Sequence, residues 1–164
     1  MDVRSVRYDH PDAVKLNDQV QLEYIQRYGD GDGDETPLDA SMFQPPCGLY
    51  LIAYDDEGHP VATGGWRARS QGDGEDEGYE DGDAELKRMY VVAEARGRGL
   101  ARIMLAALEA DARTAGRTRM VLETGDKQPE AIALYTSSGY GDSEKKFGHY
   151  REYEGSRCFV KQLT

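Results

Sequence analysis

The alternation of apolar and polar positions is clearest in the middle of the chain. An apolar-rich run over 86–92 is typical of a strand, and apolar residues then recur at helical spacing over 100–116. Arg119–Glu123 is again typical of a strand. This order of strand, amphipathic helix and strand predicts one parallel βαβ unit, Glu85–Glu123, with a right-handed crossover.

The same pattern divides the rest of the chain into shorter elements. Predicted strands cover 3–8, 48–54, 61–67, 147–153 and 157–161. Predicted helices cover 11–28, in one or two pieces, and 128–139, and a short helix is expected within 36–46. The pair Gly64-Gly65 inside a predicted strand indicates a bulge or a close approach of backbones. We expect an α/β (α+β) fold, a mixed central sheet of about six to seven strands flanked by about four helices.

Two acidic, glycine-rich segments interrupt this pattern, at 29–35 and 71–83. The first half-resembles a calcium-binding loop, but Glu35 stands where glycine is required and Ser41 where glutamate is required. We therefore interpret it as a solvated loop. The second segment is either a solvated hairpin tip or a feature that attracts a cationic substrate, and the first of these is favoured.

Length and charge limit the classes of function. A chain of 164 residues fits one domain, 1–164, with a substantial core. The net charge of −11 argues against nucleic acid or an anionic membrane as a partner and favours cationic ligands. No apolar run is long enough to span a bilayer, and no signal peptide is recognisable. Cys47 and Cys158 have no metal-ligand spacing, so we expect reduced thiols and a cytoplasmic protein.

The segment between the central strand and its helix has the chemistry of an anion site. The first N–H groups of a helix have no partner within it, and that end of the helix has a partial positive charge. Gly97 and Gly99 allow a ligand to approach the backbone, while Arg96, Arg98 and Arg102 add full charges. Together these features predict a site for phosphate or diphosphate.

Two common phosphate motifs do not fit this segment. No Walker string is present, and a dinucleotide fingerprint starting at Gly97 would need Gly or Ala at 102, where Arg stands. The run Arg96-x-x-Gly99-x-Ala101 instead resembles the Q/R-x-x-G-x-G/A signature of the GNAT N-acetyltransferase superfamily. Downstream, 128–140 resembles the second motif of that family, N-x-x-A-x-x-L-Y-x-x-x-G-F, with Gln in the place of Asn.

The resemblance implies a GNAT fold and acetyl-coenzyme A as co-substrate, with its diphosphate at the Arg/Gly loop and its pantetheine arm along the preceding strand. The cofactor-binding residues it implies are Met89, Tyr90, Val91, Arg96, Gly97, Arg98, Gly99, Leu100, Ala101, Arg102 and Gln128. Because pantetheine contains two amides, it can pair with a strand edge as an added strand does. The side chains of Met89 and Val91 fit a plain core role equally well.

Two catalytic residues follow from the same resemblance. Glu85 stands where many family members have a general base, about 13 Å before Met89 at ~3.3 Å per residue. The alternative is a surface glutamate paired with Lys87 or Arg88. Tyr135 matches the tyrosine that can protonate or contact the departing thiolate, and its alternative is core packing.

Residues of the acceptor site are less clearly indicated. Aromatic rings and a carboxylate suit a cation, which makes Tyr28, Trp66, Glu123, Phe147 and Tyr150 candidates, although each is more often core or surface. No metal constellation is recognisable, and the Gly-x-Ser-x-Gly elbow of serine hydrolases is absent.

The sequence therefore predicts an acyltransferase enzyme that moves an acetyl group from acetyl-coenzyme A to a primary amine, by direct transfer in a ternary complex. The acceptor is a small cationic amine or a peptide or protein amine, and the sequence does not choose between them. The alternatives are a non-catalytic acyl-coenzyme A sensor and, less favoured, a cation-binding interaction protein. The family resemblance also suggests a homodimer.

Overall fold

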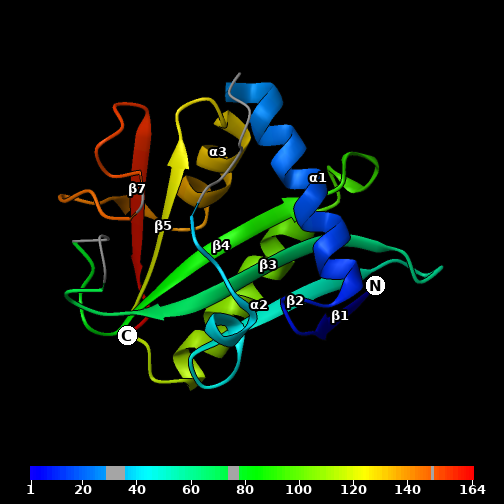
Figure 1. Ribbon diagram of the computed structural model, residues 1–164, viewed down its shortest axis with the longest axis horizontal. Coiled ribbons are helices and arrows are strands. Elements are labelled where there is room, and N and C mark those ends of the chain that lie inside the picture. The colour runs from blue at the N-terminus through cyan, green and yellow to red at the C-terminus, as the bar shows by residue number, and fades with distance from the viewer. Residues whose placement is uncertain (29–35, 74–77, 149) are drawn as a thin grey trace.

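A computed structural model describes residues 1–28, 36–73, 78–148 and 150–164 of the chain (Figure 1). The strands are β1 (Asp2–Ser5), β2 (Gly48–Tyr54), β3 (Pro60–Arg69), β4 (Asp83–Val91), β5 (Arg119–Gly125), β6 (Gly141–Asp142) and β7 (Ser156–Gln162). The α-helices are α1 (Pro11–Tyr28), α2 (Leu100–Thr114) and α3 (Pro129–Ser137), and short 3-10 helices cover Ala40–Phe43 and Ala93–Ala95.

The strands form a single sheet of seven strands in the order β1-β2-β3-β4-β5-β7-β6. Every neighbouring pair is antiparallel except β4 and β5, which are parallel and are joined through α2. The predicted fold class and the single βαβ unit are therefore confirmed. The pair that breaks the antiparallel pattern lies near the middle of the sheet, as Figure 1 shows.

Apolar clusters cover the sheet, two large ones and a smaller one formed by Tyr79, Val121, Phe147 and Cys158. On one face, Trp66 and Leu86 pack with Met104 and Leu108 of α2. On the other face, residues of β2 such as Tyr50 pack with α1 and the 3-10 helix at Ala40–Phe43. The alternation of side chains along each strand explains why neighbouring residues belong to opposite cores.

Strands β4 and β5 pair over only a short length and then separate. Their parallel register covers Asp83–Glu85 opposite Arg119–Val121 and ends there. Just beyond this point β4 has a bulge, where Arg88 has φ of 60° and an extra residue stands opposite Gly64. Because a bulge bends its strand, β4 turns away from β5, and the two arrows diverge in Figure 1. The bulge expected near Gly64-Gly65 is thus confirmed.

Most predicted elements are present. The short helix expected within 36–46 is the 3-10 helix Ala40–Phe43. The helix over 11–28 is observed with the predicted bounds, as one piece. The two-residue strand β6 was not predicted. The strand predicted over 147–153 is wrong: Phe147 is fully buried against Tyr79, and Gly148 has φ of +87°, so the chain turns here instead of extending. The proposed calcium-like loop at 29–35 lies outside the described residues.

Candidate active site

A cavity of about 310 Å³ lies beside the end of β4, beyond the point where its pairing with β5 stops. Met89–Val91 of β4 form one wall and α3 forms another. Residues on one side of α1 form a third. The loop before α2 and the first turn of α2 form its end. Of the residues predicted to bind the cofactor, the cavity is lined by Met89, Tyr90, Val91, Arg96, Gly97, Gly99, Leu100, Ala101, Arg102 and Gln128.

The end of this cavity has the geometry of an anion cradle. Gly97 and Gly99 have φ of +82° and +78°, which glycine adopts without strain, and Gly99 is the N-cap of α2. No described atom lies within 4 Å of a Cβ built at either glycine, so the backbone is open to a ligand. The first N–H groups of α2 lie at this open surface without helical partners. The cradle therefore fits a diphosphate.

Arg96 and Arg102, the two arginines at the cradle end of the cavity, are held by different elements. Arg96 donates to Glu23 of α1 at 2.8 and 3.0 Å and to the Val91 carbonyl at 2.9 Å. Arg102 donates to Ser137 Oγ at 2.6 Å and to Ser138 Oγ at 3.3 Å, both at the end of α3. Both guanidiniums thus lie beside the cradle with their orientation fixed.

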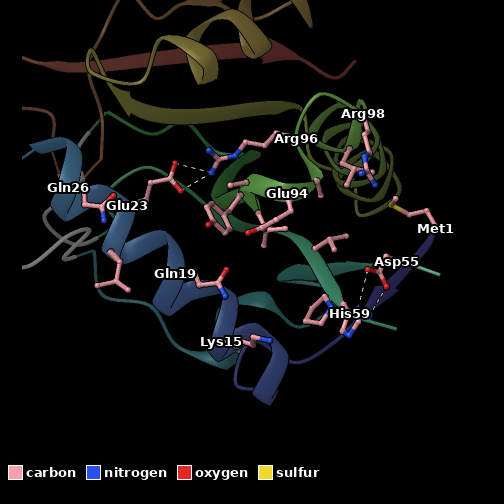
Figure 2. Close-up of a pocket in the computed structure, with 18 of the residues that line it drawn as sticks. Met1, Lys15, Gln19, Glu23, Gln26, Asp55, His59, Glu94, Arg96 and Arg98 are labelled. Carbon is pink, nitrogen blue, oxygen red and sulfur yellow. Dashed lines mark hydrogen bonds and ion pairs between the residues drawn. The ribbon is translucent and has the colours of Figure 1, made fainter. Parts of the chain in front are cut away.

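Arg98 lies elsewhere, in a neighbouring groove of about 880 Å³. This groove runs between α1 and the segment 93–98, and Figure 2 shows Arg98, Lys15 and His59 around it. The ion pair between Glu23 and Arg96 lines both the groove and the cavity. Of the predicted cradle residues, only Arg98 is not among those that line the cavity.

Glu85 lies at the apex between the diverging strands and is only 1% exposed. Its Oε1 accepts a hydrogen bond from Arg67 Nε at 2.7 Å, within a buried ion pair. Its Oε2 accepts from the Tyr79 hydroxyl at 2.5 Å. Glu85 is therefore not the surface glutamate of the alternative interpretation, and both of its oxygens have donors.

Sequence comparison identifies the family to which this architecture belongs. The family model described as acetyltransferase (GNAT) family matches residues 14–140. The chain belongs to the GNAT family. It is therefore an acyltransferase enzyme that transfers an acetyl group from an acyl-coenzyme A.

Similar proteins come from several bacteria. The IAA acetyltransferase of Azospirillum brasilense is 44% identical over 71 residues, which is 43% of this chain and 46% of that protein. The uncharacterised N-acetyltransferase YjgM of Escherichia coli is 33% identical over 80% of this chain and 76% of its own length. The first of these matches therefore spans less than half of the relative's length.

Two solved structures illustrate the shared fold. A Klebsiella pneumoniae protein described as an acyl-CoA N-acyltransferase is 28% identical, with a TM-score of 0.77 over 99% of this chain and 97% of that one. The Salmonella typhimurium protein yncA, solved with its cofactor acetyl-CoA, is 16% identical, with a TM-score of 0.67 over 100% and 94% of the two chains. The latter likeness is one of fold alone.

In this GNAT enzyme Tyr135 lines the cavity from α3. Among the described residues its hydroxyl has no hydrogen-bond partner, while its ring packs edge-on against Tyr140 at 5.5 Å. Burial raises the pKa of the Tyr135 phenol above its ordinary value. The hydroxyl is therefore available to donate a hydrogen bond into the cavity and keeps its proton at neutral pH.

The predicted acceptor residues occupy different places. Tyr28 ends α1 above the cavity, where its hydroxyl accepts from Gln128 Nε2 at 3.2 Å. Glu123 of β5 accepts a hydrogen bond from the Tyr150 backbone N–H at 3.2 Å. It lies two residues beyond Val121, where the pairing of β5 with β4 ends. Phe147 is fully buried beside Tyr79.

Trp66 is not part of this group. It is fully buried, lies on the α2 face of the sheet and donates its indole N–H to Asp111 at 2.9 Å. The adjacent residue Arg67 has the opposite orientation and pairs with Glu85. Trp66 is therefore a core residue.

Arg67 and Tyr79 are the site residues that the sequence analysis missed. Arg67 stands directly opposite Glu85 in the register of β3 and β4. The sequence does not predict this pairing, because a bulge shifts the register by one residue. Tyr79 lies in the acidic segment that was interpreted as a solvated tip, yet it is only 3% exposed. The one available signal was a single aromatic residue in a segment whose residues 72–83 are otherwise all acidic or glycine.

Two further classes of site receive no support from the described residues. None of the helices in the described part of the chain is both long enough and apolar enough to span a bilayer. Across the same residues, no three His, Cys, Asp or Glu side chains gather as a metal site would require.

Proposed function

We propose that this enzyme transfers the acetyl group of acetyl-coenzyme A to a primary amine, directly and within a ternary complex. The single observation that supports it most is the cavity along β4, which has an anion cradle at one end, while the buried carboxylate of Glu85 lies four residues before Met89 on the same strand. Acetyl-coenzyme A has a diphosphate and a thioester separated by an extended arm. The diphosphate would lie at the cradle, the arm along Met89–Val91 and the thioester toward Glu85.

Glu85 is proposed as the base that takes the proton of the acceptor amine. A lysine-like amine, with a pKa of ~10.4, costs about 4.6 kcal/mol to deprotonate at pH 7. A positioned carboxylate, acting directly or through one water, contributes roughly 10²–10⁴-fold. Arg67 and Tyr79 support this role because they fix the direction of the carboxylate.

The other chemical roles fall to residues along the cavity. The cradle residues and the edge of β4 would hold acetyl-coenzyme A, which supplies the activated acetyl group. Backbone N–H groups near Met89–Val91 are suited to polarise the thioester carbonyl. Tyr135 is suited to donate a hydrogen bond to the departing thiolate, because thiols have a pKa of ~8.5 and the phenol is less acidic.

Direct transfer is favoured over a covalent acetyl-cysteine route. Burial raises the pKa of the Cys158 thiol, which disfavours the reactive thiolate. Cys47 is exposed and precedes β2, away from the residues that line the cavity. For the acceptor, the net charge of −11 favours a cationic amine, either a small molecule or the amine of a peptide.

The test is release of free thiol from acetyl-coenzyme A across a panel of primary amines. We expect amine-dependent release by the wild type and a loss of about 10²-fold or more in kcat for Glu85→Gln near pH 7. Binding of acetyl-coenzyme A without release for any amine would indicate a sensor instead of an enzyme acting on amines. Equal rates for wild type and folded Glu85→Gln would remove Glu85 from the role of base.

A further inference from the structure

The connection between β3 and β4 returns to the sheet at Tyr79 and is fixed on both sides of it. Gly78 has φ of +104°, and a Cβ added there would lie 2.7 Å from the Lys146 carbonyl oxygen, so this backbone passes close to the segment before β7. After Tyr79, the Glu80 N–H donates to Asp83 Oδ2 at 2.8 Å, and Asp83 is fully buried. Tyr79 is therefore held from both ends.

The Tyr79 side chain is also fixed by its contacts. Its ring lies 5.3 Å from the ring of Phe147, centroid to centroid, and the Arg69 guanidinium lies over it at 4.8 Å. Its hydroxyl donates to Glu85 Oε2 at 2.5 Å. A buried phenol held in this way defines one position for its hydroxyl, and with it one position for the oxygen that accepts from it.

Arg67 and Tyr79 hold different oxygens of Glu85. The Arg67 Nε–H donates to Oε1, and one such bond leaves the plane of a carboxylate free to rotate about the contact. The bond from Tyr79 to Oε2 removes that freedom. Catalysis by a base depends on such orientation, because a displacement of about 1 Å can cost roughly 10²-fold in rate.

We propose that Tyr79 is a positioning residue for acetyl transfer, whose hydroxyl holds the Glu85 carboxylate in the orientation in which it accepts the proton of the amine. This inference rests on the proposed function of Glu85. The connection between β3 and β4 would then take part in the reaction, because the Tyr79 hydroxyl bonds the proposed base.

The chain offers a matched control in a second tyrosine–carboxylate pair. Tyr54 of β2 donates to Asp12 Oδ2 of α1 at 2.6 Å and is 7% exposed. Neither residue lines the cavity between β4 and α3. Tyr54→Phe therefore removes the same kind of bond without touching the proposed machinery.

The experiment compares Tyr79→Phe, Glu85→Gln, the double variant and Tyr54→Phe in steady-state assays with acetyl-coenzyme A and the best amine of the panel. All are assayed at a temperature at which circular dichroism shows them folded. We expect Tyr79→Phe to lower kcat about tenfold with the KM for acetyl-coenzyme A unchanged. Tyr79→Phe should have no further effect in the Glu85→Gln background, and Tyr54→Phe should keep kcat within about twofold of wild type.

Three outcomes would overturn the inference, and they can be told apart. If Glu85→Gln is impaired but Tyr79→Phe has the wild-type kcat, the positioning role is wrong and the proposed function stands. If the losses simply multiply in the double variant, or Tyr54→Phe loses as much as Tyr79→Phe, the effect is structural. If Glu85→Gln itself has the wild-type kcat, the base role fails and the positioning role fails with it.

Discussion

At the scale of single residues, the two groups proposed to handle the proton and the leaving group have different surroundings. Glu85 accepts a hydrogen bond on each oxygen, from Arg67 and from Tyr79. Tyr135 lines the cavity, and no described residue is hydrogen-bonded to its hydroxyl. The first arrangement fixes the direction of a carboxylate, and the second leaves a phenol free to donate.

Replacement of Tyr135 by Phe tests the second group. Burial raises the pKa of this phenol above its ordinary value near 10, so it stays protonated throughout the range from pH 7 to 10. We expect Tyr135→Phe to lower kcat about tenfold, because one hydrogen bond to the thiolate is lost. Below about pH 10, the alkaline side of the pH–rate profile should have the same shape in both proteins.

The matching measurement is kcat against pH for wild type and Tyr135→Phe. If the wild-type rate falls between about pH 8 and 10 and that fall is absent in the variant, Tyr135 itself ionises there and acts as an acid. That result would contradict the assignment of Tyr135 as a hydrogen-bond donor.

Strand alternation explains which single residues the sequence predicted and which it did not. Glu85 and Tyr135 were found through motifs, whose local spacing is visible in the sequence. Trp66 was a candidate because of its aromatic ring, but adjacent strand residues have opposite orientations, so Arg67 faces Glu85 and Trp66 faces α2. The contact of Tyr79 with Glu85 depends on the tertiary course of a connection that has no periodic pattern.

At the scale of elements, α1 lies along the cavity and forms ion pairs with the loop before α2 and with α3. Glu23 pairs with Arg96 beside the cradle, and Arg27 forms an ion pair with Glu130 in the first turn of α3. Arg27 also pairs with Glu23 at 3.2 Å, which makes one continuous chain of charges. Figure 2 shows the Glu23–Arg96 part of this chain from the side of the groove.

Glu23 and the diphosphate would compete for the same guanidinium. We therefore expect Glu23→Gln to bind coenzyme A about threefold more tightly than wild type, the size expected for one partly exposed ion pair. The control is Glu94→Gln, which removes the same charge from an exposed residue of the same groove that forms no ion pair within the described residues.

Calorimetry with coenzyme A at one fixed ionic strength gives both dissociation constants. Equal affinities for Glu23→Gln and Glu94→Gln would show that only the overall charge matters. Weaker binding by Glu23→Gln would show that α1 must stay bonded to Arg96 for the site to form. Either result contradicts the expected competition.

The sequence predicted elements well where hydrophobic periodicity and glycine positions agree. The unit from β4 through α2 to β5 has both signals, and its predicted bounds differ from the observed ones by a few residues. The segment 147–153 has aromatic residues, but these serve packing at a turn, where Phe147 contacts Tyr79. Composition alone does not distinguish this use of aromatic residues from a strand.

At the scale of the whole molecule, the site is a local exception to the overall charge. The chain has a net charge of −11, while two arginines and the first turn of α2 line the end of the cavity. We therefore expect an anionic cofactor to bind through these local charges and backbone N–H groups, although the net charge of the whole chain is negative. The same field favours the approach of a cationic amine.

The whole fold explains why the site lies in this place. A single parallel pair in an otherwise antiparallel sheet allows two neighbouring strands to diverge, and the bulge at Arg88 increases the divergence. The family resemblance implied this fold, but the bulge and the position of α1 across the opening follow from tertiary contacts. The sequence therefore predicted the cradle residues more completely than the residues of α1 that line the cavity.

The central claim is that the cavity between β4 and α3 holds acetyl-coenzyme A with its diphosphate at residues 96–102. A crystal structure of the protein grown with excess acetyl-coenzyme A tests it most directly. We predict the diphosphate at the N–H groups around Gly97 and Gly99, the pantetheine along Met89–Val91 and the thioester toward Glu85. An empty cavity, or a nucleotide bound elsewhere on the protein, would show that residues 96–102 do not form the diphosphate site.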